Sequence, residues 1–575
     1  MTAGEFRSEL TARLNRNGSR VLLRILRAGT PAVELTGDQI LKHSERLAHS
    51  STTAPGQVVL LLLPHSVELF LWHIGLVLTG RIPAIMPWPT TRVDPEKYHR
   101  NLAHQLQNLP ASELITVPGI AANVRSQVPY LVTAGGWAED TPCGKALSTA
   151  FSLPADGSKR RQGLPLEDAD TLFLQFSGGT TGTQKAVAVT ASLLDHQLSR
   201  LSEALDFSSE DTIVSWLPLY HDMGLIGCLW LPLWNASESV QCAASDWLLN
   251  PGLLFELLES YHGTFCWLPN FAFSYLACQR ERMTSTHALA HVRGYINCSE
   301  PVQFRSLDTF VATFSDWGVN RRQIQSSYAM AENVFAVTQS RLGREPVTVL
   351  RTEVIQENSP ALLPFGLLDD VYVSSGAPLG GTQVRVLDAA GKLCREREAG
   401  EIQLFSESLF SGYWSSDGVR TAPRTKDGWY PTGDYGFLAK GELYVIGRLK
   451  DIVIVGGQNV FPEDIEGLAN TVAGVYPGRV VAFGTNNSQG TESLVILAEM
   501  KSSYDRDRAV ALEKEISSLV VSSIGIAPGR VCVLPERWIV KSTAGKISRR
   551  ETRERYLRER DRLRQDVSAV EEIHR

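Results

Sequence analysis

Short apolar runs alternate with amphipathic stretches along the larger, N-terminal part of the chain. The apolar runs have the length and flanking turns of buried strands. They are Val58–Leu63, Glu113–Val117, Leu172–Phe176, Thr212–Trp216 and Thr264–Leu268. Between them lie stretches with helical spacing, Val67–Leu78, Ser192–Leu205 and Leu253–Tyr261. This alternation predicts βαβ units, and therefore an α/β fold whose sheets are covered by helices on both faces.

The pattern of predicted secondary structure changes twice toward the C-terminus. From Val371 short β-type runs and glycine-containing turns dominate, as in Gln383–Asp388 and Glu401–Phe405. A second break falls at Gly447–Asp451, after which strands and one long helix (Arg508–Val521) predict a small α+β domain. We therefore expect two domains, residues 1–449 and 450–575. The charged tail Ser548–Arg575 predicts a solvated surface helix, because its arginines alternate with acids.

Composition narrows the class of protein. A chain of 575 residues exceeds one ordinary core, so at least two domains are expected, and 43% apolar with 21% charged residues is typical of a soluble globular protein. A net charge of −6 argues against a nucleic-acid surface. The eight cysteines form no paired motif, which indicates reduced thiols in a cytoplasmic protein. No stretch predicts a signal peptide or a membrane span, since Pro64, His65 and Glu68 interrupt the most apolar one.

The segment Ser177–Lys185 carries the strongest chemical signal. It reads Ser-Gly-Gly-Thr-Thr-Gly-Thr-Gln-Lys and lies between two apolar runs. Glycines let backbone N–H groups turn inward, and hydroxyls with an ammonium add donors, so the loop suits nucleotide phosphates. It is not a Walker A loop, because Lys185 runs into a strand and not a helix. A plain Gly/Thr-rich turn is the alternative.

Four further motifs follow in order. They are Tyr328-Ala-Met-Ala-Glu332, Tyr430-Pro-Thr-Gly-Asp434, Gly447-Arg-Leu-Lys-Asp451 and Gly545-Lys546-Ile-Ser-Arg-Arg550. With the loop, they resemble the adenylate-forming superfamily of acyl- and aryl-CoA ligases, peptide-synthetase adenylation domains and luciferases. Two more segments, Trp216–Ile226 and Pro269–Phe273, look like the fatty acyl-AMP ligase branch. The resemblance implies a small distorted β-barrel after Val371 and a mobile C-terminal domain.

The resemblance also assigns roles. It implies ATP and Mg²⁺ as cofactors, with Thr180, Thr181 and Lys185 on the β- and γ-phosphates and Glu332 as the metal carboxylate. Asp434 and Arg448 would bind the ribose, and Tyr328 would pack beside the adenine. The full nucleotide-binding set is Ser177, Gly178, Gly179, Thr180, Thr181, Gly182, Lys185, Asn297, Cys298, Ser299, Glu300, Tyr328, Ala329, Met330, Ala331, Asp434 and Arg448.

Catalysis is assigned to Lys546, Glu332 and His221. Lys546 would lie between the substrate carboxylate and the α-phosphate, where two anions must approach each other. His221 would border the acyl channel and Asp222 would anchor its loop. The two are no dyad, because adjacent residues on an extended segment point in opposite directions. The acyl pocket would be lined by Trp216, Tyr220, Trp230, Trp267, Phe271 and Phe273. These aromatics predict a wide apolar pocket for a bulky or long-chain acid, although large aromatics often only fill a core.

Four positions depart from the family pattern around the nucleotide. They are Gly178 for Ser, Gln184 for Pro, Cys298 for Gly and Ala329 for Gly. A methyl or thiol beside adenine would cost about 1–3 kcal/mol of binding through crowding. The sequence therefore leaves open an enzyme that depends on acyl-AMP made elsewhere.

The thiol acceptor has two signals that disagree. Pro346–Pro364 has the texture of the insertion in ligases that load a carrier protein, whereas Gly456-Gly457 resembles the CoA-ligase form, with a tunnel for pantetheine. Lys450 would be the hinge that exchanges this loop for Lys546. We expect a CoA ligase acting through acyl-AMP. The alternatives are an acyl-AMP ligase that loads an acyl carrier protein, a thioesterification-only enzyme served by a separate adenylating enzyme, and an inactive binding protein.

Overall fold

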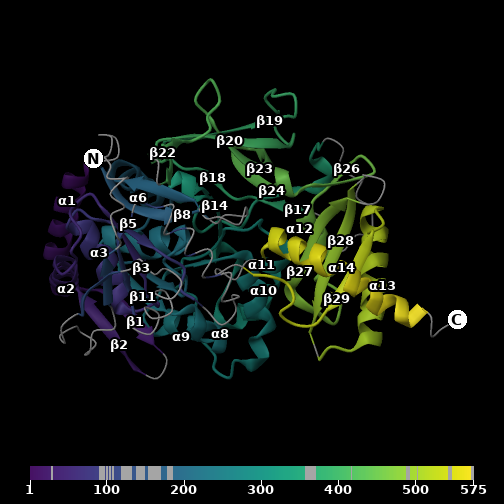
Figure 1. Ribbon diagram of the computed structural model, residues 1–575, viewed down its shortest axis with the longest axis horizontal. Coiled ribbons are helices and arrows are strands. Elements are labelled where there is room, and N and C mark those ends of the chain that lie inside the picture. The colour runs from purple at the N-terminus through teal and green to yellow at the C-terminus, as the bar shows by residue number, and fades with distance from the viewer. Residues whose placement is uncertain are drawn as a thin grey trace.

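The computed structural model describes most of the chain (Figure 1). The residues outside the description are 28–29, 90–97, 99–101, 103–104, 106–108, 110, 118–131, 137–148, 153–169, 178–184, 357–370, 416–417, 487–491, 502, 542–546 and 572–575. The predicted α/β class is confirmed: two large sheets, helices around them, and smaller sheets toward the C-terminus make up the described fold.

The first large sheet has nine strands, of which the six central ones, from β14 to β1, run parallel. In spatial order they are β18 (Ala377–Pro378), β15 (Ala336–Gln339), β14 (Ile324–Ala329), β13 (Gly294–Cys298), β12 (Phe265–Leu268), β10 (Thr212–Ser215), β11 (Glu238–Cys242), β1 (Val21–Arg27) and β2 (Thr30–Thr36). Parallel strands place their carboxyl ends at one edge, which is where ligands bind in such sheets.

The second large sheet also has nine strands and a parallel centre formed by β8, β4, β3 and β5. In spatial order they are β22 (Gly418–Thr421), β21 (Gly412–Ser415), β9 (Ala186–Thr190), β8 (Thr171–Phe176), β4 (Ile82–Ile85), β3 (Val58–Leu62), β5 (Ala111–Thr116), β7 (Thr149–Ser152) and β6 (Val132–Gly136). The strands expected from apolar runs are confirmed within two residues at their ends.

Helices fill the space between and around the two sheets. They are α1 (Ala3–Arg16), α2 (Gly37–His49), α3 (Val67–Leu78), α6 (Ala191–Ala204), α7 (Leu231–Trp234), α8 (Ala244–Leu249), α9 (Leu253–Ser260), α10 (Asn270–Cys278) and α11 (Phe304–Phe314), with the π-helical η2 (Met223–Trp230). Single 3₁₀ turns are η3 (Arg280–Arg282), η4 (Ser315–Trp317), η5 (Arg321–Gln323) and η7 (Arg351–Glu353). The largest core cluster joins apolar residues of both sheets with those of α3, α6 and η2. Apolar burial between two sheets is therefore the main stabilising term for this part of the chain.

The region after β17 is antiparallel. β17 (Val371–Val373) pairs with β16 (Thr348–Leu350), and a separate four-stranded sheet follows, with β19 (Thr382–Leu387), β20 (Gly400–Ser406), β23 (Tyr430–Ala439) and β24 (Glu442–Arg448) in that order. The predicted change at Val371 to a β-rich region is thus confirmed. Among the residues that the structure describes, these four strands form an open sheet, so the barrel stays a prediction.

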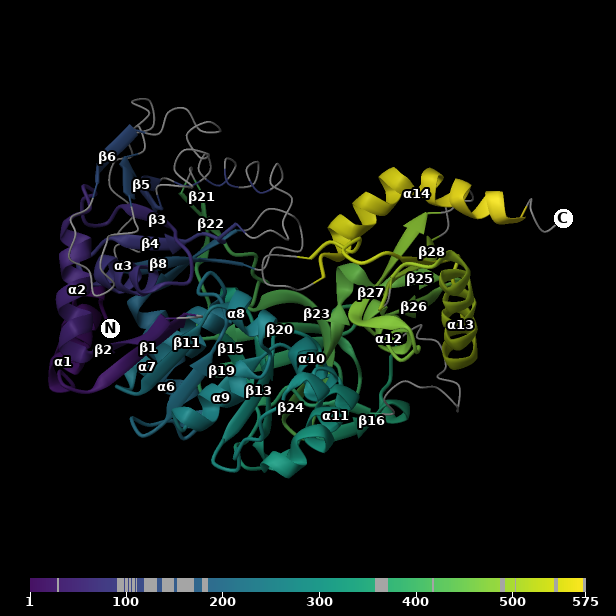
Figure 2. The same cartoon turned by 90° about the horizontal axis from the view of Figure 1, so that it is seen from below.

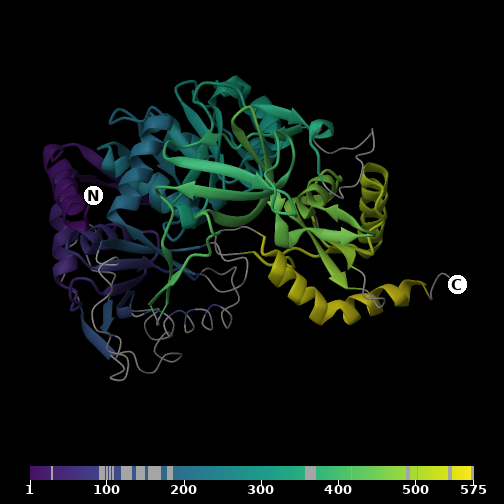
Figure 3. The ribbon, with the colours of Figure 1, turned by 90° about the horizontal axis from the view of Figure 1, so that it is seen from above.

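The C-terminal part has its own core. A hairpin of β25 (Val453–Val455) and β26 (Gln458–Val460) accompanies a sheet of β27 (Val475–Asn486), β28 (Glu492–Met500) and β29 (Arg530–Leu534), with α12 (Pro462–Ala469), α13 (Arg506–Ile524) and α14 (Arg549–Glu571). Figure 2 shows this part at the end of the molecule opposite α1, and Figure 3 shows α14 running along its edge toward the C-terminus. The split at 449/450 stays a prediction. No described helix is long and apolar enough to cross a bilayer.

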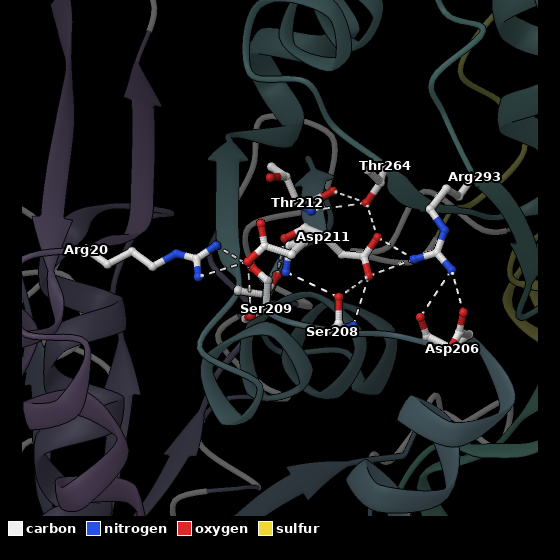
Figure 4. A network of polar contacts seen from close by, with 10 residues as sticks. Arg20, Asp206, Ser208, Ser209, Asp211, Thr212, Thr264 and Arg293 are labelled. Atoms are coloured by element: carbon white, nitrogen blue, oxygen red, sulfur yellow. Dashed lines mark hydrogen bonds and ion pairs between the residues drawn. The ribbon is translucent and has the colours of Figure 1, made fainter.

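A polar network lies at the edge of the first sheet where β10 and β12 begin (Figure 4). Asp211 is buried and accepts hydrogen bonds from Arg293, with 2.7 Å to Oδ1 and 2.8 Å to Oδ2. Thr264 Oγ1 donates to the same carboxylate at 2.9 Å, as does the backbone N–H of Ser208. The carboxylate therefore ties three separate segments to one end of the sheet.

Asp211→Ala is expected to lower the free energy of unfolding by about 3–5 kcal/mol, because it leaves a partly buried guanidinium and a hydroxyl without their acceptor. Urea unfolding followed by tryptophan fluorescence measures the shift of the first transition. Asp308→Ala is the control, because Asp308 pairs with Arg321 at the surface. That change should cost at most about 1 kcal/mol; an equal effect of the two variants would contradict a structural role for the Asp211 network.

Candidate active site

The candidate site lies where the carboxyl ends of β13 and β14 meet the four-stranded sheet. Tyr328, near the end of β14, donates its hydroxyl to Asp434 Oδ2 at 2.5 Å. Arg448 on β24 faces Asp434 on β23 in register, and its Nε lies 3.2 Å from Oδ1. The structure thus brings together three residues that the sequence placed around the adenine and the ribose.

The charge state of this group follows from its surroundings. Burial, and then the neighbouring Asp434 carboxylate, raise the pKa of Tyr328 well above its usual value. The phenol therefore stays protonated and acts as a donor. Burial lowers the pKa of Arg448, but Asp434 and the other acidic neighbours outweigh it, so the net shift is upward. Asp434, which is 6% exposed, accordingly keeps two donors and can accept further hydroxyls.

Glu332 lies one turn beyond β14, in the 3₁₀ turn η6 (Ala331–Asn333). Its Oε1 accepts a 2.7 Å hydrogen bond from the hydroxyl of Tyr413 on β21. The Tyr413 hydroxyl is also 3.4 Å from that of Tyr430. Burial, and then Glu332, raise the pKa of Tyr413 and bring that of Tyr430 to about 12. Both tyrosines are therefore neutral donors beside the carboxylate.

The turn that carries Glu332 is held tightly. The side-chain amide of Gln175 on β8 donates to the carbonyls of Ala331 at 3.0 Å and Val334 at 2.7 Å. Val334 has φ 61° and ψ −53°, and Phe335 N–H donates to Asn333 O at 2.6 Å. This is a γ-turn of the strained kind, which persists only where neighbouring contacts enforce it. The strain and its anchors fix the backbone next to Glu332.

The phosphate loop is described only at its two ends. Ser177 N–H donates to Lys185 O at 2.9 Å, and Lys185 N–H donates to Ser177 Oγ at 3.4 Å. These two hydrogen bonds hold the first and last residues of the loop together, between β8 and β9. The Lys185 ammonium lies 4.5 Å from the centroid of the Tyr413 ring. The loop residues assigned to phosphate, Gly178, Gly179, Thr180, Thr181 and Gly182, and the departure Gln184, lie outside the described residues.

The segment Asn297–Glu300 spans the end of β13, and hydrogen bonds tie it to the start of α10. Asn297 is buried and donates to Asn270 Oδ1 at 2.8 Å, and Glu300 accepts from Phe271 N–H at 2.9 Å. Ser299 has φ 76°, a left-handed conformation that is unusual for a residue with a side chain. These contacts couple the predicted adenine wall to the element that carries Phe271.

Cys298, one of the predicted departures, is fully buried within the large core cluster. Burial, with a smaller contribution from the Cys298 thiol, raises the pKa of the Cys228 thiol on η2 to about 12. This position gives no support to the predicted crowding of adenine by the thiol. Ala329 packs on the same cluster, whereas Met330 packs against two small clusters, one on the four-stranded sheet and one that joins β9 to the segment around Phe410.

His221 and Asp222 were expected on an extended segment, and that expectation is wrong. They form a turn that leads into η2, and Asp222 has helical angles, φ −50° and ψ −45°. Its Oδ1 accepts a 2.8 Å hydrogen bond from Met223 N–H, so it caps the helix start. His221 stacks obliquely on Tyr220 at 4.7 Å between ring centroids. The backbone carbonyl of Pro218 approaches Gly224 so closely that a Cβ atom on residue 224 would lie 2.4 Å from the carbonyl oxygen.

The predicted pocket aromatics separate into two groups. Trp216 and Tyr220 follow the carboxyl end of β10 and Phe271 lies in the first turn of α10, and Trp216 stacks on Trp247 at 3.9 Å. The others, Trp230, Trp267 and Phe273, are at most 1% exposed. Trp230 stacks on Phe173 at 5.7 Å, which accounts for its burial by packing between the two sheets. The first group is the better candidate for an acyl channel.

The predicted hinge lies beside the site. Lys450 belongs to η8 (Leu449–Asp451), and burial, followed by Arg448, lowers its pKa. The next residue, Asp451, pairs with Arg549 at 2.8 Å, and Arg549 also contacts Glu463 and Glu466 of α12. Lys546 lies outside the described residues. Lys541, which precedes that gap, places its ammonium 5.7 Å from the Phe271 ring.

Gly456 and Gly457 connect β25 to β26 as a two-residue turn. Their φ values, 58° and 81°, are those of a type I′ turn, which favours glycine at both positions. Both residues are exposed, and a Cβ at either one would meet nothing within 4 Å. The hairpin thus explains the glycine pair by itself, and the pantetheine tunnel stays a prediction.

Tyr413 and Gln175 are the site residues that sequence reasoning missed. The available signal for Tyr413 was the Gly412-Tyr413-Trp414 run in the β-rich region, which pairs with β9 directly after the phosphate loop. Gln175 gave a weaker signal, a single amide within the apolar strand β8. Both act through strand pairing and backbone contacts across long sequence separations, which a linear pattern does not contain.

Among the groups of His, Cys, Asp and Glu that the described residues form, none has three members placed to hold a metal ion. Glu332 offers one carboxylate, partly exposed and held at one oxygen by Tyr413. This fits Mg²⁺, which commonly takes one or two protein carboxylates together with substrate phosphates and waters.

Known proteins resemble this chain over most of its length. A family model described as AMP-binding enzyme matches residues 11–414. A long-chain-fatty-acid–AMP ligase of Mycobacterium marinum is 28% identical over 557 residues, 91% of this chain and 92% of its own. A medium-chain-fatty-acid–[acyl-carrier-protein] ligase of Moorena producens is 29% identical over 410 residues, 68% of each chain.

A structure solved in a study of fatty acyl-adenylate ligases from E. coli and L. pneumophila has a TM-score of 0.78 at 23% identity, covering 95% of this chain and 97% of that one. At this identity the likeness establishes the fold. The chain belongs to the AMP-binding enzyme family of adenylate-forming ligases, on the branch of acyl-CoA synthetases and fatty acyl-AMP ligases.

Proposed function

We propose that this ligase uses ATP to convert a bulky or long-chain apolar carboxylic acid into its acyl-AMP, and then transfers the acyl group to the thiol of CoA. The observation that supports it best is a set of contacts around two protonated tyrosines. Tyr328 donates to Asp434, which also pairs with Arg448. Tyr413 donates to Glu332, and its ring lies against the Lys185 ammonium.

In the first step a carboxylate oxygen attacks the α-phosphorus of ATP and pyrophosphate leaves. Two anions must meet, so positioning and positive charge supply the catalysis. Lys185 would hold the departing phosphates, Asp434 would accept the ribose hydroxyls, and Lys546 would offset the repulsion at the reacting centre. Bound Mg²⁺ on Glu332 would neutralise phosphate charge. In the second step the thiol attacks the acyl carbonyl and AMP leaves.

The acid is proposed from the aromatic residues at the carboxyl ends of β10 and β12. Trp216, Tyr220 and Phe271 offer apolar faces beside the segment that follows β13. The names of two relatives, ligases of long-chain and medium-chain fatty acids, support an aliphatic chain.

For the acceptor we propose CoA, on the exposed glycine turn at Gly456-Gly457, which presents no side chain to an approaching pantetheine arm. The domain of residues 450–575 would rotate about Lys450 to bring this turn to the acyl-AMP. A carrier protein is the second candidate, because one relative is named as a ligase of acyl-carrier-protein. The segment Pro346–Pro364, which suggested this acceptor, is described only to residue 356.

One assay with four arms tests the proposal. The protein receives either a fatty acid with ATP and Mg²⁺ or synthetic acyl-AMP, and each is combined with CoA or with a holo carrier protein. We expect AMP and acyl-CoA from both sources of acyl group. If product forms only on the carrier protein, the acceptor is the carrier protein and not CoA. If product forms only from synthetic acyl-AMP, the protein does not catalyse the first step. If no arm gives product, the chain is a binding protein and not a ligase.

A further inference from the structure

Tyr413 occupies the space between the two groups assigned to ATP and its metal. Its hydroxyl donates to Glu332 Oε1 at 2.7 Å, while its ring face carries the Lys185 ammonium at 4.5 Å. Strand pairing produces this arrangement, because Tyr413 is opposite Val187 and Trp414 is opposite Ala186 in the β21–β9 ladder. One side chain thus contacts both the carboxylate and the cation.

We infer that Tyr413 is a positioning residue that sets Glu332 for the metal and Lys185 for the phosphates. The inference rests on the proposed function for the identity of these ligands. It assigns Tyr413 no contact with the reacting atoms.

The hydroxyl and the ring do different work. A glutamate side chain has three rotatable bonds, and one donor on Oε1 restricts its orientation while leaving Oε2 for a metal ion. The negative face of an aromatic ring attracts an ammonium, so the ring restricts the long lysine side chain at the mouth of the phosphate loop. The hydroxyl therefore acts on the metal carboxylate, and the ring acts on the phosphate cation.

The surroundings hold Tyr413 in place. Its ring packs edge-on against Phe410 at 4.8 Å between centroids, and its hydroxyl is 3.4 Å from that of Tyr430. Phe410 N–H also donates to the backbone carbonyl of Glu332 at 2.8 Å. The same short segment thus fixes both the backbone and the carboxylate of Glu332, as a positioning role requires.

Two substitutions separate the hydroxyl from the ring. Tyr413→Phe removes the donor and keeps the ring, whereas Tyr413→Leu removes both. Tyr444→Phe is the control, because Tyr444 is a phenol that stacks on Phe437 within the four-stranded sheet and is buried more fully than Tyr413. Calorimetry measures binding of α,β-methylene ATP, an analogue that cannot transfer AMP to an acid because its α,β bridge does not break, over a series of Mg²⁺ concentrations and in EDTA.

Tyr413→Phe should raise the Mg²⁺ concentration for half-maximal nucleotide binding about tenfold, the usual scale for a lost hydrogen bond to a charged group. Its binding in EDTA should stay within about twofold, since the ring still carries Lys185. Tyr413→Leu should in addition weaken binding in EDTA about threefold to fivefold through the lost cation–π contact. Tyr444→Phe should match the wild type in both conditions.

An unchanged Mg²⁺ dependence in Tyr413→Phe, or an equal change in Tyr444→Phe, would overturn the inference. A wild-type protein that binds the analogue without any response to Mg²⁺ would overturn it as well. A wild type that binds with Mg²⁺ but forms no acyl-AMP would instead remove the proposed function, and the comparison of the three variants would still decide the role of Tyr413.

Discussion

Lys546→Ala is expected to slow acyl-AMP formation by about 100- to 1000-fold, the scale seen when one donor to developing charge is removed. Its ammonium would lie between the carboxylate and the α-phosphate, where repulsion peaks as the two anions meet. Conversion of synthetic acyl-AMP to thioester should stay within about twofold, because that step places no charge where Lys546 would act. Pyrophosphate release measures the first step, and chromatography of the thioester measures the second.

Lys541→Ala is the matched control for this prediction. It removes an ammonium from the same connection between β29 and α14, but from a position against the ring of Phe271. A single cation–π contact of this kind contributes about 0.5–1 kcal/mol, so the control should lose less than about tenfold. Equal loss of both half-reactions in a folded Lys546→Ala protein would remove the idea that the C-terminal domain alternates between two poses.

A complementary variant should block only the second step. Gly457→Trp places a large side chain on the turn that would receive the pantetheine arm. Gly457 has φ 81°, so any side chain also strains the hairpin. Gly457→Asn controls for this strain, because asparagine tolerates left-handed angles while adding little bulk. We expect acyl-AMP formation to survive in both variants and thioester formation to fail only with tryptophan.

The sequence predicted the fold class and much of the site because these depend on local signals. Apolar runs located the parallel strands, and motif order placed Tyr328, Asp434 and Arg448, which the structure brings within hydrogen-bonding distance. The helix α1 was missed although its signal is visible: Phe6, Leu10 and Leu14 recur at helical spacing and are buried.

The remaining features depend on strand pairing and on local turn geometry. Nothing near Glu332 in the sequence indicates that Tyr413, on a strand of the other large sheet, supplies its hydrogen bond. The glycine pair at Gly456-Gly457 carried a functional interpretation that a hairpin turn explains equally well. Likewise, the extended geometry assumed for His221 failed because a helix start, capped by Asp222, follows at once. Pairing register and turn type decide these features, and a linear pattern reports neither.

Asp434→Ala is expected to raise the KM for ATP about 100-fold. The change removes the acceptor proposed for both ribose hydroxyls and leaves Tyr328 and Arg448 without their carboxylate. Loss of hydrogen bonds to a charged group costs about 1.5–3 kcal/mol each, which is tenfold or more in affinity.

Asp427→Ala is the control, since Asp427 also pairs with an arginine, Arg385, but at the exposed face of the same sheet. The KM for the acid should change little in either variant, because the acid is assigned to aromatic residues at β10 and α10, whereas β23 belongs to the separate four-stranded sheet. A similar rise in both KM values for Asp434→Ala would indicate local unfolding of β23 and β24, and unchanged ATP kinetics would remove Asp434 from the nucleotide site.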